Sequence, residues 1–190
     1  MGCIVHSGIC DVKGSGEPVN TALKIEELGP IAEGKAVAAA RELLLEYGRF
    51  VIAQPGAAQF CYGSLEREAD GLPTSFAEQG GGCLVARLHG EPAGFVAWRA
   101  IAPGAQVKTD AWELKRLWVR PVARGLRLGQ LLTQAVLDRA AAAKRSAVYL
   151  DTAPAAMASA HRLYLEMGFT QCERYNDNPV DGLVFMVKFI

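Results

Sequence analysis

The sequence predicts an α/β fold: a mixed, mostly antiparallel central sheet of about seven strands, with about four helices on its faces. Three β-rich runs follow one another between residues 83 and 119, which favours antiparallel neighbours. Strand, helix and strand then succeed one another between residues 111 and 151, which favours one parallel crossover. The 190 residues have the length of one ordinary domain. We expect a mobile tail over residues 1–20 and a single domain over residues 21–190.

The first half of the chain combines a strand, two helices and a hairpin. A short strand is expected over residues 21–28. From residue 31 apolar residues recur with helical period, and Gly48 stands where that helix is expected to end. A second helix is predicted over residues 57–70. The runs "CLVARL" and "AGFVAWRAI" flank the turn-forming "HGEP", which is a hairpin signature.

The second half adds a strand, a loop, two helices and three more strands. The run "AWELKRLWV" at residues 111–119 leads into the loop "RGLRLG" at residues 124–129. The apolar residues of the next helix have amphipathic spacing: Leu128, Leu131, Leu132, Ala135 and Val136. "SAVYLDT" is a predicted strand, and a helix over residues 156–167 should end at Gly168. The last strands are expected around "FTQCERY" and "LVFMVKFI".

Charge and composition argue against several classes of function. Lys plus Arg and Asp plus Glu count 20 each, so the chain lacks the basic excess of a nucleic-acid binder. No apolar stretch reaches the roughly 18–20 residues of a membrane span. The five cysteines form no CxxC pair and the histidines no HxxxH motif, so we expect free thiols and no metal site. The composition favours a cytoplasmic enzyme or binding domain without nucleic-acid or membrane partners.

The loop "RGLRLG" has the form of an anion site. A strand that runs into a helix through a glycine-containing loop leaves N–H groups unpaired at the positive end of the helix dipole. Gly125 and Gly129 allow close approach, while Arg124 and Arg127 add positive charge. The fingerprints GxGxxG and GxxxxGK[ST] do not match this loop. On the loop alone, a tight turn with solvated arginines is an equally good interpretation.

The loop and its surroundings together resemble the GNAT superfamily of acyl-coenzyme A-dependent N-acetyltransferases. "ELKRLWVRPVARGLRLGQLL" precedes "HRLYLEMGF", and the family's R/Q-x-x-G-x-G/A signature aligns with residues 124–129, where Arg127 replaces the middle glycine. The resemblance covers roughly residues 21–190 and is strongest from 111 to 169. "LDTAPAAMASA" and "YNDNPVDGLVFM" resemble a bacterial subgroup with poorly defined substrates. The resemblance implies a GNAT-like domain that binds acetyl-CoA as acyl donor, with the pyrophosphate on this loop.

The resemblance also implies roles for single residues. Glu113 would be the general base, directly or through one water, and Tyr164 the acid that faces the sulfur. The alternatives are a surface or salt-bridged Glu113, paired with Lys115 or Arg116, and a core aromatic at Tyr164. The residues expected to contact the cofactor are Leu117, Trp118, Val119, Arg124, Gly125, Leu126, Arg127, Leu128, Gly129, Gln130 and Tyr164.

The backbone of the strand before the loop carries further expectations. Pleat alternation would put Glu113, Lys115, Leu117 and Val119 on one face, and Leu114, Arg116 and Trp118 on the other. The main chain of Leu117 and Val119 would hold the pantetheine arm. Arg127 fits the loop if its φ is helical or extended. Met157 stands where many members have an asparagine, so we expect weaker anchoring of that arm.

The expected function is transfer of an acetyl group to the primary amine of a small molecule or peptide. The alternatives are a coenzyme A-binding module without catalysis and a domain that binds another nucleotide through the same loop. Tyr175, Asn176 and Asn178 would line the acceptor pocket, or else belong to an ordinary loop. His161 and Cys172 receive no catalytic role. Paired subunits are common in the superfamily, so the resemblance is compatible with a homodimer.

Overall fold

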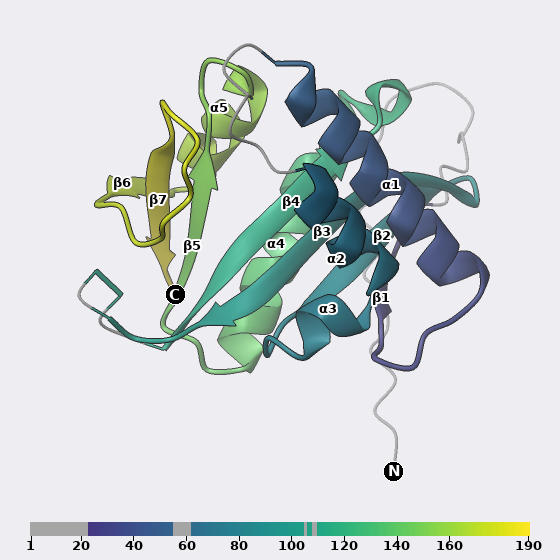
Figure 1. The fold of residues 1–190 in the computed structure, drawn as a ribbon, viewed down its shortest axis with the longest axis horizontal. Helices are drawn as coiled ribbons and strands as arrows, with labels where there is room; N and C mark the ends of the chain where they lie inside the picture. The colour runs from purple at the N-terminus through teal and green to yellow at the C-terminus, as the bar shows by residue number, and fades with distance from the viewer. Residues whose placement is uncertain (1–22, 55–61, 105, 108–109) are drawn as a thin grey trace, which may run out of the picture.

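The computed structural model describes residues 23–54, 62–104, 106–107 and 110–190, and it contains one seven-stranded sheet (Figure 1). The strand order is β1-β2-β3-β4-β5-β7-β6. Of the strand pairs in this described part, β4–β5 alone is parallel, which confirms the mixed, mostly antiparallel sheet. The strands are β1 (Leu23–Leu28), β2 (Gly82–Leu88), β3 (Glu91–Ile101), β4 (Ala111–Val119), β5 (Ala147–Thr152), β6 (Thr170–Cys172) and β7 (Val184–Phe189).

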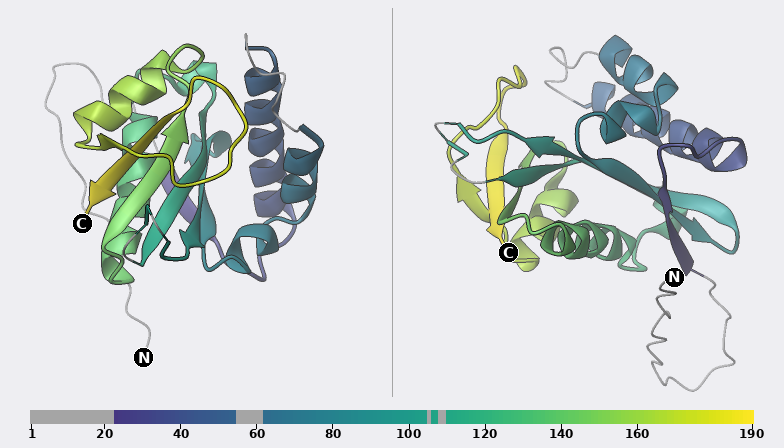
Figure 2. Two further views of the ribbon diagram at one scale, coloured as in Figure 1. Left: turned by 60° about the vertical axis from the view of Figure 1, so that its left-hand side comes forward. Right: turned by 90° about the horizontal axis from the view of Figure 1, so that it is seen from below.

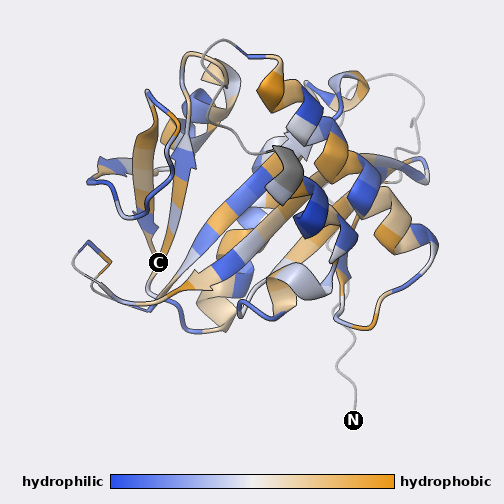
Figure 3. Cartoon of the chain, viewed as in Figure 1, coloured by the Kyte–Doolittle hydropathy of each residue, from blue (hydrophilic) through white to orange (hydrophobic). Residues whose placement is uncertain are grey.

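Helices cover both faces of the sheet (Figure 2). On one face, Leu43 of α1 packs in one core cluster with Phe95 of β3. On the other, Leu132 of α4 packs in a second cluster with Val96, the next residue of β3. This alternation of neighbouring residues follows the two-residue period of a strand, and Figure 3 shows hydrophobic and hydrophilic bands alternating along the central strands. The helices are α1 (Lys35–Ile52), α2 (Tyr62–Asp70), α3 (Thr74–Ala77), α4 (Leu128–Ala142) and α5 (Ala158–Glu166).

The helices differ from the prediction in two details. The described residues contain five α-helices, because α3 is a single turn of four residues and is too short to show a helical period. Helix α1 continues past Gly48 to Ile52, and both Gly48 and the following Val51 are buried against the rest of the protein. The expected tail over residues 1–20 and the start of the predicted helix over 57–70 lie outside the described residues.

Helix α4 presents a slightly different face to the sheet than its leucines suggest. Leu128, Leu132 and Val136 are buried as predicted, but Leu131 is 42% exposed. Thr133 is fully buried instead, and its hydroxyl donates a hydrogen bond of 2.8 Å to the carbonyl of Gly129. A threonine can turn inward here because that backbone acceptor satisfies its only donor.

Strand β4 contains a bulge that reverses its pleat. The pairing with β3 passes from Ala97–Lys115 to Phe95–Trp118, and Arg116 has a φ of 60°. Leu114 and Leu117 therefore both pack on the α4 side, while Trp118 packs on the α1 side. The predicted distribution of β4 residues over the two faces is wrong for this reason: Glu113 and Leu117 do not share a face.

Strands β4 and β5 separate after Glu113, ahead of the bulge. Their parallel pairing covers only Ala111–Glu113 with Ala147–Tyr149, although both strands continue. From that point β5 remains paired with β7, and β4 remains paired with β3. The carboxyl-terminal ends of β4 and β5 are therefore not hydrogen-bonded to each other. The loop before α4 begins at this end of β4 (Figure 1).

Candidate functional site

Two adjoining cavities lie at the separated ends of β4 and β5. The larger, of about 610 Å³, is a groove between the end of β4, the loop of residues 123–130 and helix α5. The smaller, of about 140 Å³, lies between residues 114–117 of β4, the end of β5 and the segment 178–183. The two cavities share Tyr47, Leu117, Ala156, Met157 and Ala160 as lining residues, so they adjoin along these residues.

The loop at the mouth of the groove, residues 124–130, offers a row of free backbone donors. No group in the described part of the chain accepts a hydrogen bond from the N–H groups of residues 125–130. The last three of these belong to the first turn of α4, where a helix leaves its N–H groups unpaired. Donors at the positive end of a helix dipole suit a phosphate or another anion. The residues present therefore fit the pyrophosphate of a nucleotide cofactor.

Arg127 adopts the left-handed conformation, with φ 56° and ψ 18°. The condition of a helical or extended φ, under which a side chain was expected to fit here, is therefore not met. A residue with a Cβ atom pays roughly 1–2 kcal/mol for this conformation, which glycine adopts freely. Gly125 also has a positive φ, of 84°, so the loop turns twice through the left-handed region. Arg124 lies over the ring of Trp118, with its guanidinium 5.4 Å from the ring centroid.

Tyr164 is a core aromatic that also reaches the smaller cavity, and its role as the acid stays a prediction. It is buried in the core beside Phe169, with ring centroids 5.7 Å apart, and it also lines the smaller cavity. Burial raises the pKa of its phenol well above the usual value, and the electrostatic effects of Tyr47 and Asp151 raise it further. The phenol is therefore protonated at neutral pH and can donate a hydrogen bond into the cavity.

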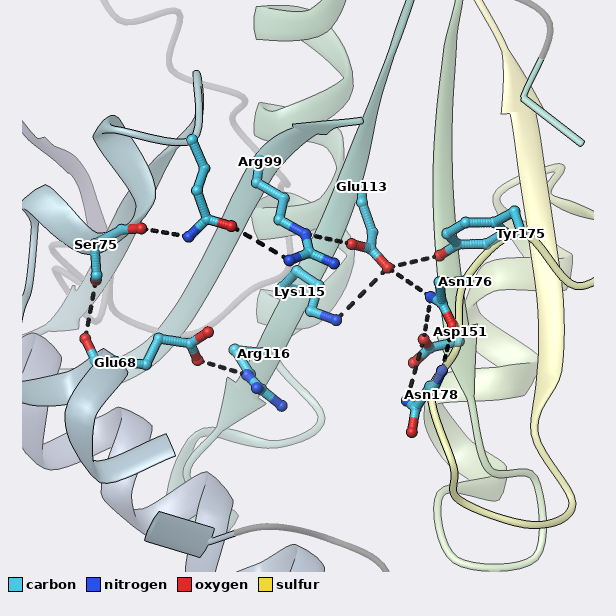
Figure 4. Close-up of polar contacts among 11 residues, drawn as sticks. Glu68, Ser75, Arg99, Glu113, Lys115, Arg116, Asp151, Tyr175, Asn176 and Asn178 are labelled. Carbon is cyan, nitrogen blue, oxygen red and sulfur yellow. Dashed lines mark hydrogen bonds and ion pairs between the residues drawn. The ribbon is translucent and has the colours of Figure 1, made fainter. Parts of the chain in front are cut away.

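Glu113 lies in a buried network of ion pairs and hydrogen bonds (Figure 4). Its carboxylate is fully buried, which excludes the surface alternative. Arg99 Nε donates to one oxygen at 2.6 Å, and Lys115 Nζ lies 3.6 Å from the other. Tyr175 and Asn176 also donate to that second oxygen, at 2.9 and 3.0 Å. Glu113 lines neither cavity, so its role as general base stays a prediction.

Asp151, at the end of β5, was missed in the sequence and lines the smaller cavity. Its Oδ2 atom accepts hydrogen bonds from Asn176 at 2.9 Å and from Asn178 at 3.3 Å. No described residue donates to its Oδ1 atom, which leaves that oxygen available to a ligand. The available signal was an aspartate at the carboxyl end of a predicted strand, which is a common place for ligand-binding side chains in α/β sheets.

The remaining predicted pocket residues divide between the cavity and the network around it. Asn178 lines the smaller cavity, whereas Tyr175 packs against Tyr149 and donates to Glu113. Met157, which stands where many GNAT proteins have an asparagine, lines both cavities. Thr152 also lines the smaller cavity, and its buried hydroxyl has no hydrogen-bond partner among the described residues.

The cations of β4 form the opposite wall of the smaller cavity. Arg116 projects from the bulge, donates to Glu68 at 2.8 Å and lies over the ring of Tyr47 at 5.7 Å. Lys115 lines the cavity beside it. Over the described ranges, no group of three or more His, Cys, Asp and Glu side chains could hold a metal ion. No helix within these ranges is long and apolar enough to cross a membrane.

The loop and the signature residues fall inside a region that matches a family model. The model is that of the acetyltransferase (GNAT) family, and it matches residues 42–169, well over half of the chain. An uncharacterised N-acetyltransferase from Schizosaccharomyces pombe is 39% identical over 105 residues, which is 54% of this chain. The chain spans about 60% of that relative's length. Because this relative comes from a yeast, the bacterial subgroup stays a prediction.

Solved structures share the fold at low sequence identity. A GNAT-family acetyltransferase from Staphylococcus aureus superposes with a TM-score of 0.67 at 17% identity, over 88% of this chain and 99% of that one. The PaiA N-acetyltransferase from Thermoplasma acidophilum, in complex with coenzyme A, gives 0.67 at 15%, over 89% and 99%. A ribosomal-protein-alanine N-acetyltransferase from Brucella melitensis gives 0.65 at 20%, over 88% and 99%. Together with the matched family model, the shared fold leads to one conclusion: this chain belongs to the acetyltransferase (GNAT) family.

Proposed function

We propose that the protein is an N-acetyltransferase that transfers the acetyl group of acetyl-CoA to the primary amine of a small molecule. The observation that supports the proposal is the arrangement of the groove and the smaller cavity. A groove that begins at the free N–H groups of residues 125–130 opens into a cavity lined by Asp151 and Tyr164. An anionic cofactor at one end and an acceptor at the other would meet at the shared residues, near Leu117.

The loop and β4 would hold the cofactor. The backbone N–H groups of residues 125–130 suit the pyrophosphate, and the exposed side chains of Arg124 and Arg127 add positive charge near it. The main chain of Leu117–Val119, whose edge is not paired with β5, would contact the pantetheine arm. A structural relative of this chain holds coenzyme A, which supports this assignment of the groove.

Two side chains of the smaller cavity would serve the reaction: Asp151 would take the proton of the amine, and Tyr164 would stabilise the departing thiolate, which then takes a proton from solvent. Acetyl-CoA supplies the activated acyl group: attack by the amine nitrogen forms the C–N bond and breaks the C–S bond of the thioester. Asp151 would orient the amine through its free Oδ1 atom and accept the proton that the nitrogen loses. Tyr164, kept protonated by burial, would donate its hydrogen bond to the departing sulfur. We assign Glu113 the role of holding Asn176, because its two oxygens already have partners.

The competing function is a coenzyme A-binding module that has no catalytic activity. Acetyl-CoA binding is common to both functions and should raise the melting temperature; a ligand at about 100 times its Kd stabilises by roughly 2.7 kcal/mol. The two functions differ in thiol release, which should occur when acetyl-CoA is mixed with a panel of small amines. Stabilisation without any thiol release would favour the module, and stabilisation by ATP or NAD alone would favour another nucleotide.

Asp151→Asn tests the assignment of the proton acceptor. The amide keeps the shape of the side chain but cannot take a proton, so kcat should fall by roughly 10²- to 10⁴-fold. The Kd of acetyl-CoA, measured by calorimetry, should change less than about twofold because Asp151 lies outside the groove. Asp138→Asn, at an exposed position of α4, is the matched control. An unchanged kcat in Asp151→Asn would remove Asp151 from the chemistry.

A further inference from the structure

The charges of the smaller cavity are divided between its two walls. Lys115 and Arg116 come from β4, whereas Asp151 lies at the end of β5 and Asp181 in the segment before β7. Figure 4 shows the Lys115 side chain extending from β4 toward Asp151 and the asparagines that hold it. Lys115 and Asp151 both line this cavity and form no ion pair with each other, so a ligand in the cavity can contact both.

Lys115 has more hydrogen-bond donors on its ammonium group than its one ion pair with a described residue can use. Its side chain is only 15% exposed, and its one ion pair with a described residue is that to Glu113, at 3.6 Å. That separation is longer than a hydrogen bond, and an ammonium group carries three donors. A mostly buried ammonium is stable only where an anion or another acceptor compensates for lost hydration. Glu113 supplies part of this compensation, and an anionic group of a ligand would be a second acceptor for the remaining donors.

Asp151 offers the complementary group on the opposite wall. Asn176 and Asn178 both donate to Oδ2 and fix the carboxylate plane, while Oδ1 receives nothing from the described residues. A protonated or partly protonated amine is the natural donor to such an oxygen. The cavity thus presents a cation on one wall and a fixed carboxylate on the other.

We propose that the acceptor is a free amino acid or a similar small molecule that carries a carboxylate beside its amine. This proposal rests on the acetyltransferase function proposed above and names the class of its substrate. Lys115 binds the carboxylate of the acceptor, and Asp151 binds its amine next to Tyr164. Arg116, which donates a hydrogen bond to Glu68, places a second positive charge close to the carboxylate of the acceptor.

The dimensions of the cavity agree with this class of acceptor. One water molecule needs roughly 10–15 Å³ of cavity volume. The smaller cavity, of about 140 Å³, therefore holds on the order of ten non-hydrogen atoms. That is the size of an amino acid. Beside polar residues such as Gln54 and Thr152, the lining includes the apolar Val51, Leu114, Leu117 and Leu183, and this apolar part suits an uncharged side chain on the acceptor.

The test compares amino acids with their matched decarboxylated amines and carboxamides. In a thiol-release assay with acetyl-CoA, the best amino acid should have a kcat/KM at least tenfold above that of its matched amine. Lys115→Met should lower kcat/KM for the amino acid by roughly ten- to a hundredfold, as loss of a charged hydrogen bond predicts, and should lower it several-fold less for the amine, which has no carboxylate. Lys115→Arg, which keeps the charge, should retain the preference. Lys35→Met, at an exposed position of α1, is the control.

The outcomes separate the substrate class from the activity itself. If amines or carboxamides react as well as amino acids, or if Lys115→Met affects both alike, the acceptor class is wrong while the acetyltransferase function stands. If no acceptor leads to release of thiol, the proposed acetyltransferase function is wrong. Calorimetry then still measures whether an amino acid binds in the cavity. Binding of an amino acid to the coenzyme A complex, weakened in Lys115→Met, would support the cavity assignment. No binding of any amino acid would overturn it.

Discussion

Glu113 and Asn176 are joined by a hydrogen bond of 3.0 Å that links strand β4 to the segment between β6 and β7. The same amide group donates to Asp151 of β5 at 2.9 Å. One side chain therefore connects three parts of the chain that are distant in sequence and sets the orientation of the Asp151 carboxylate. Glu113, fixed in turn by Arg99, acts on the cavity through Asn176.

Glu113→Gln should weaken both the fold and the binding of the acceptor. Arg99 and Lys115 lose their buried counter-charge, so the free energy of unfolding should fall by about 3 kcal/mol, measured by urea denaturation. The acceptor KM should rise about tenfold, because Asp151 is less well fixed, while kcat stays within about threefold. Glu78→Gln, at an exposed position, is the control.

The pH profile distinguishes this positioning role from the base that the sequence predicts. A positioning Glu113 leaves the acidic limb of the kcat profile in place in Glu113→Gln. A catalytic Glu113 would give a kcat reduced by roughly 100-fold or more, the loss of that limb and an unchanged acceptor KM.

The sequence predicts the elements of this fold well because their signals are local. The hairpin of β2 and β3 and the loop at residues 124–129 each depend on neighbouring residues. The bulge at Arg116 has no such signal, since arginine does not favour a positive φ and the contacts of Arg116 with Glu68 and Tyr47 come from residues distant in sequence. Its consequence is large, because one extra residue moves every later side chain of β4 to the other face.

The side chains at the centre of the candidate site could be predicted only in part, for the same physical reason. Asp151 and Asn178 are 27 positions apart, and Arg99 and Glu113 are 14 apart, so no pattern in the sequence pairs them. The loop was predictable because its donors are backbone groups, whose positions follow from a strand, two glycines and a helix. Side-chain clusters need the register of the sheet, which the bulge alters.

Gly129→Glu should abolish binding of acetyl-CoA. A Cβ atom at this position lies 3.3 Å from Leu163 Cδ2 and 3.9 Å from Val119 Cγ2, so a larger side chain must enter the groove. Its carboxylate would also repel phosphates at the start of α4, and we expect the Kd from calorimetry to rise at least 100-fold. Gly29→Glu, at an exposed turn with open space around its Cβ, should bind normally. Retained binding in Gly129→Glu would show that the loop does not hold the cofactor.

Arg127→Gly should separate backbone strain from charge. Glycine removes the cost of the left-handed conformation but loses more entropy on folding, so the free energy of unfolding should change by less than about 1 kcal/mol. The exposed guanidinium lines the groove, and its loss should raise the Kd of acetyl-CoA about three- to tenfold at low salt. This difference should shrink as salt increases. An equal Kd for both proteins at low salt would mean that Arg127 points away from the phosphates.

Glu26 of β1 should make the stability of the sheet edge depend on pH. The hydrogen bond and charge of Arg87, at 2.7 Å, hold the pKa of Glu26 below its usual value of 4.5, against the opposing effect of burial, and Lys24 adds to the shift. A lowered pKa in the folded state means that the unfolded state binds more protons in acid. The stabilisation is therefore present above pH 4.5 and is lost as the pH falls through the folded-state pKa.

Urea denaturation of the wild type and Glu26→Gln between about pH 3 and 7 measures this contribution directly. At pH 7 the variant should be less stable by about 1 kcal/mol, because the pair is only partly buried. The difference should decline below pH 4.5 as Glu26 is protonated in both states of the wild type. Glu166→Gln, which removes the exposed pair with Arg162, should change stability by no more than about 0.5 kcal/mol. A difference between wild type and Glu26→Gln that is constant from pH 7 to pH 3 would mean that packing of the side chain, and not its charge, stabilises the β1–β2 pair.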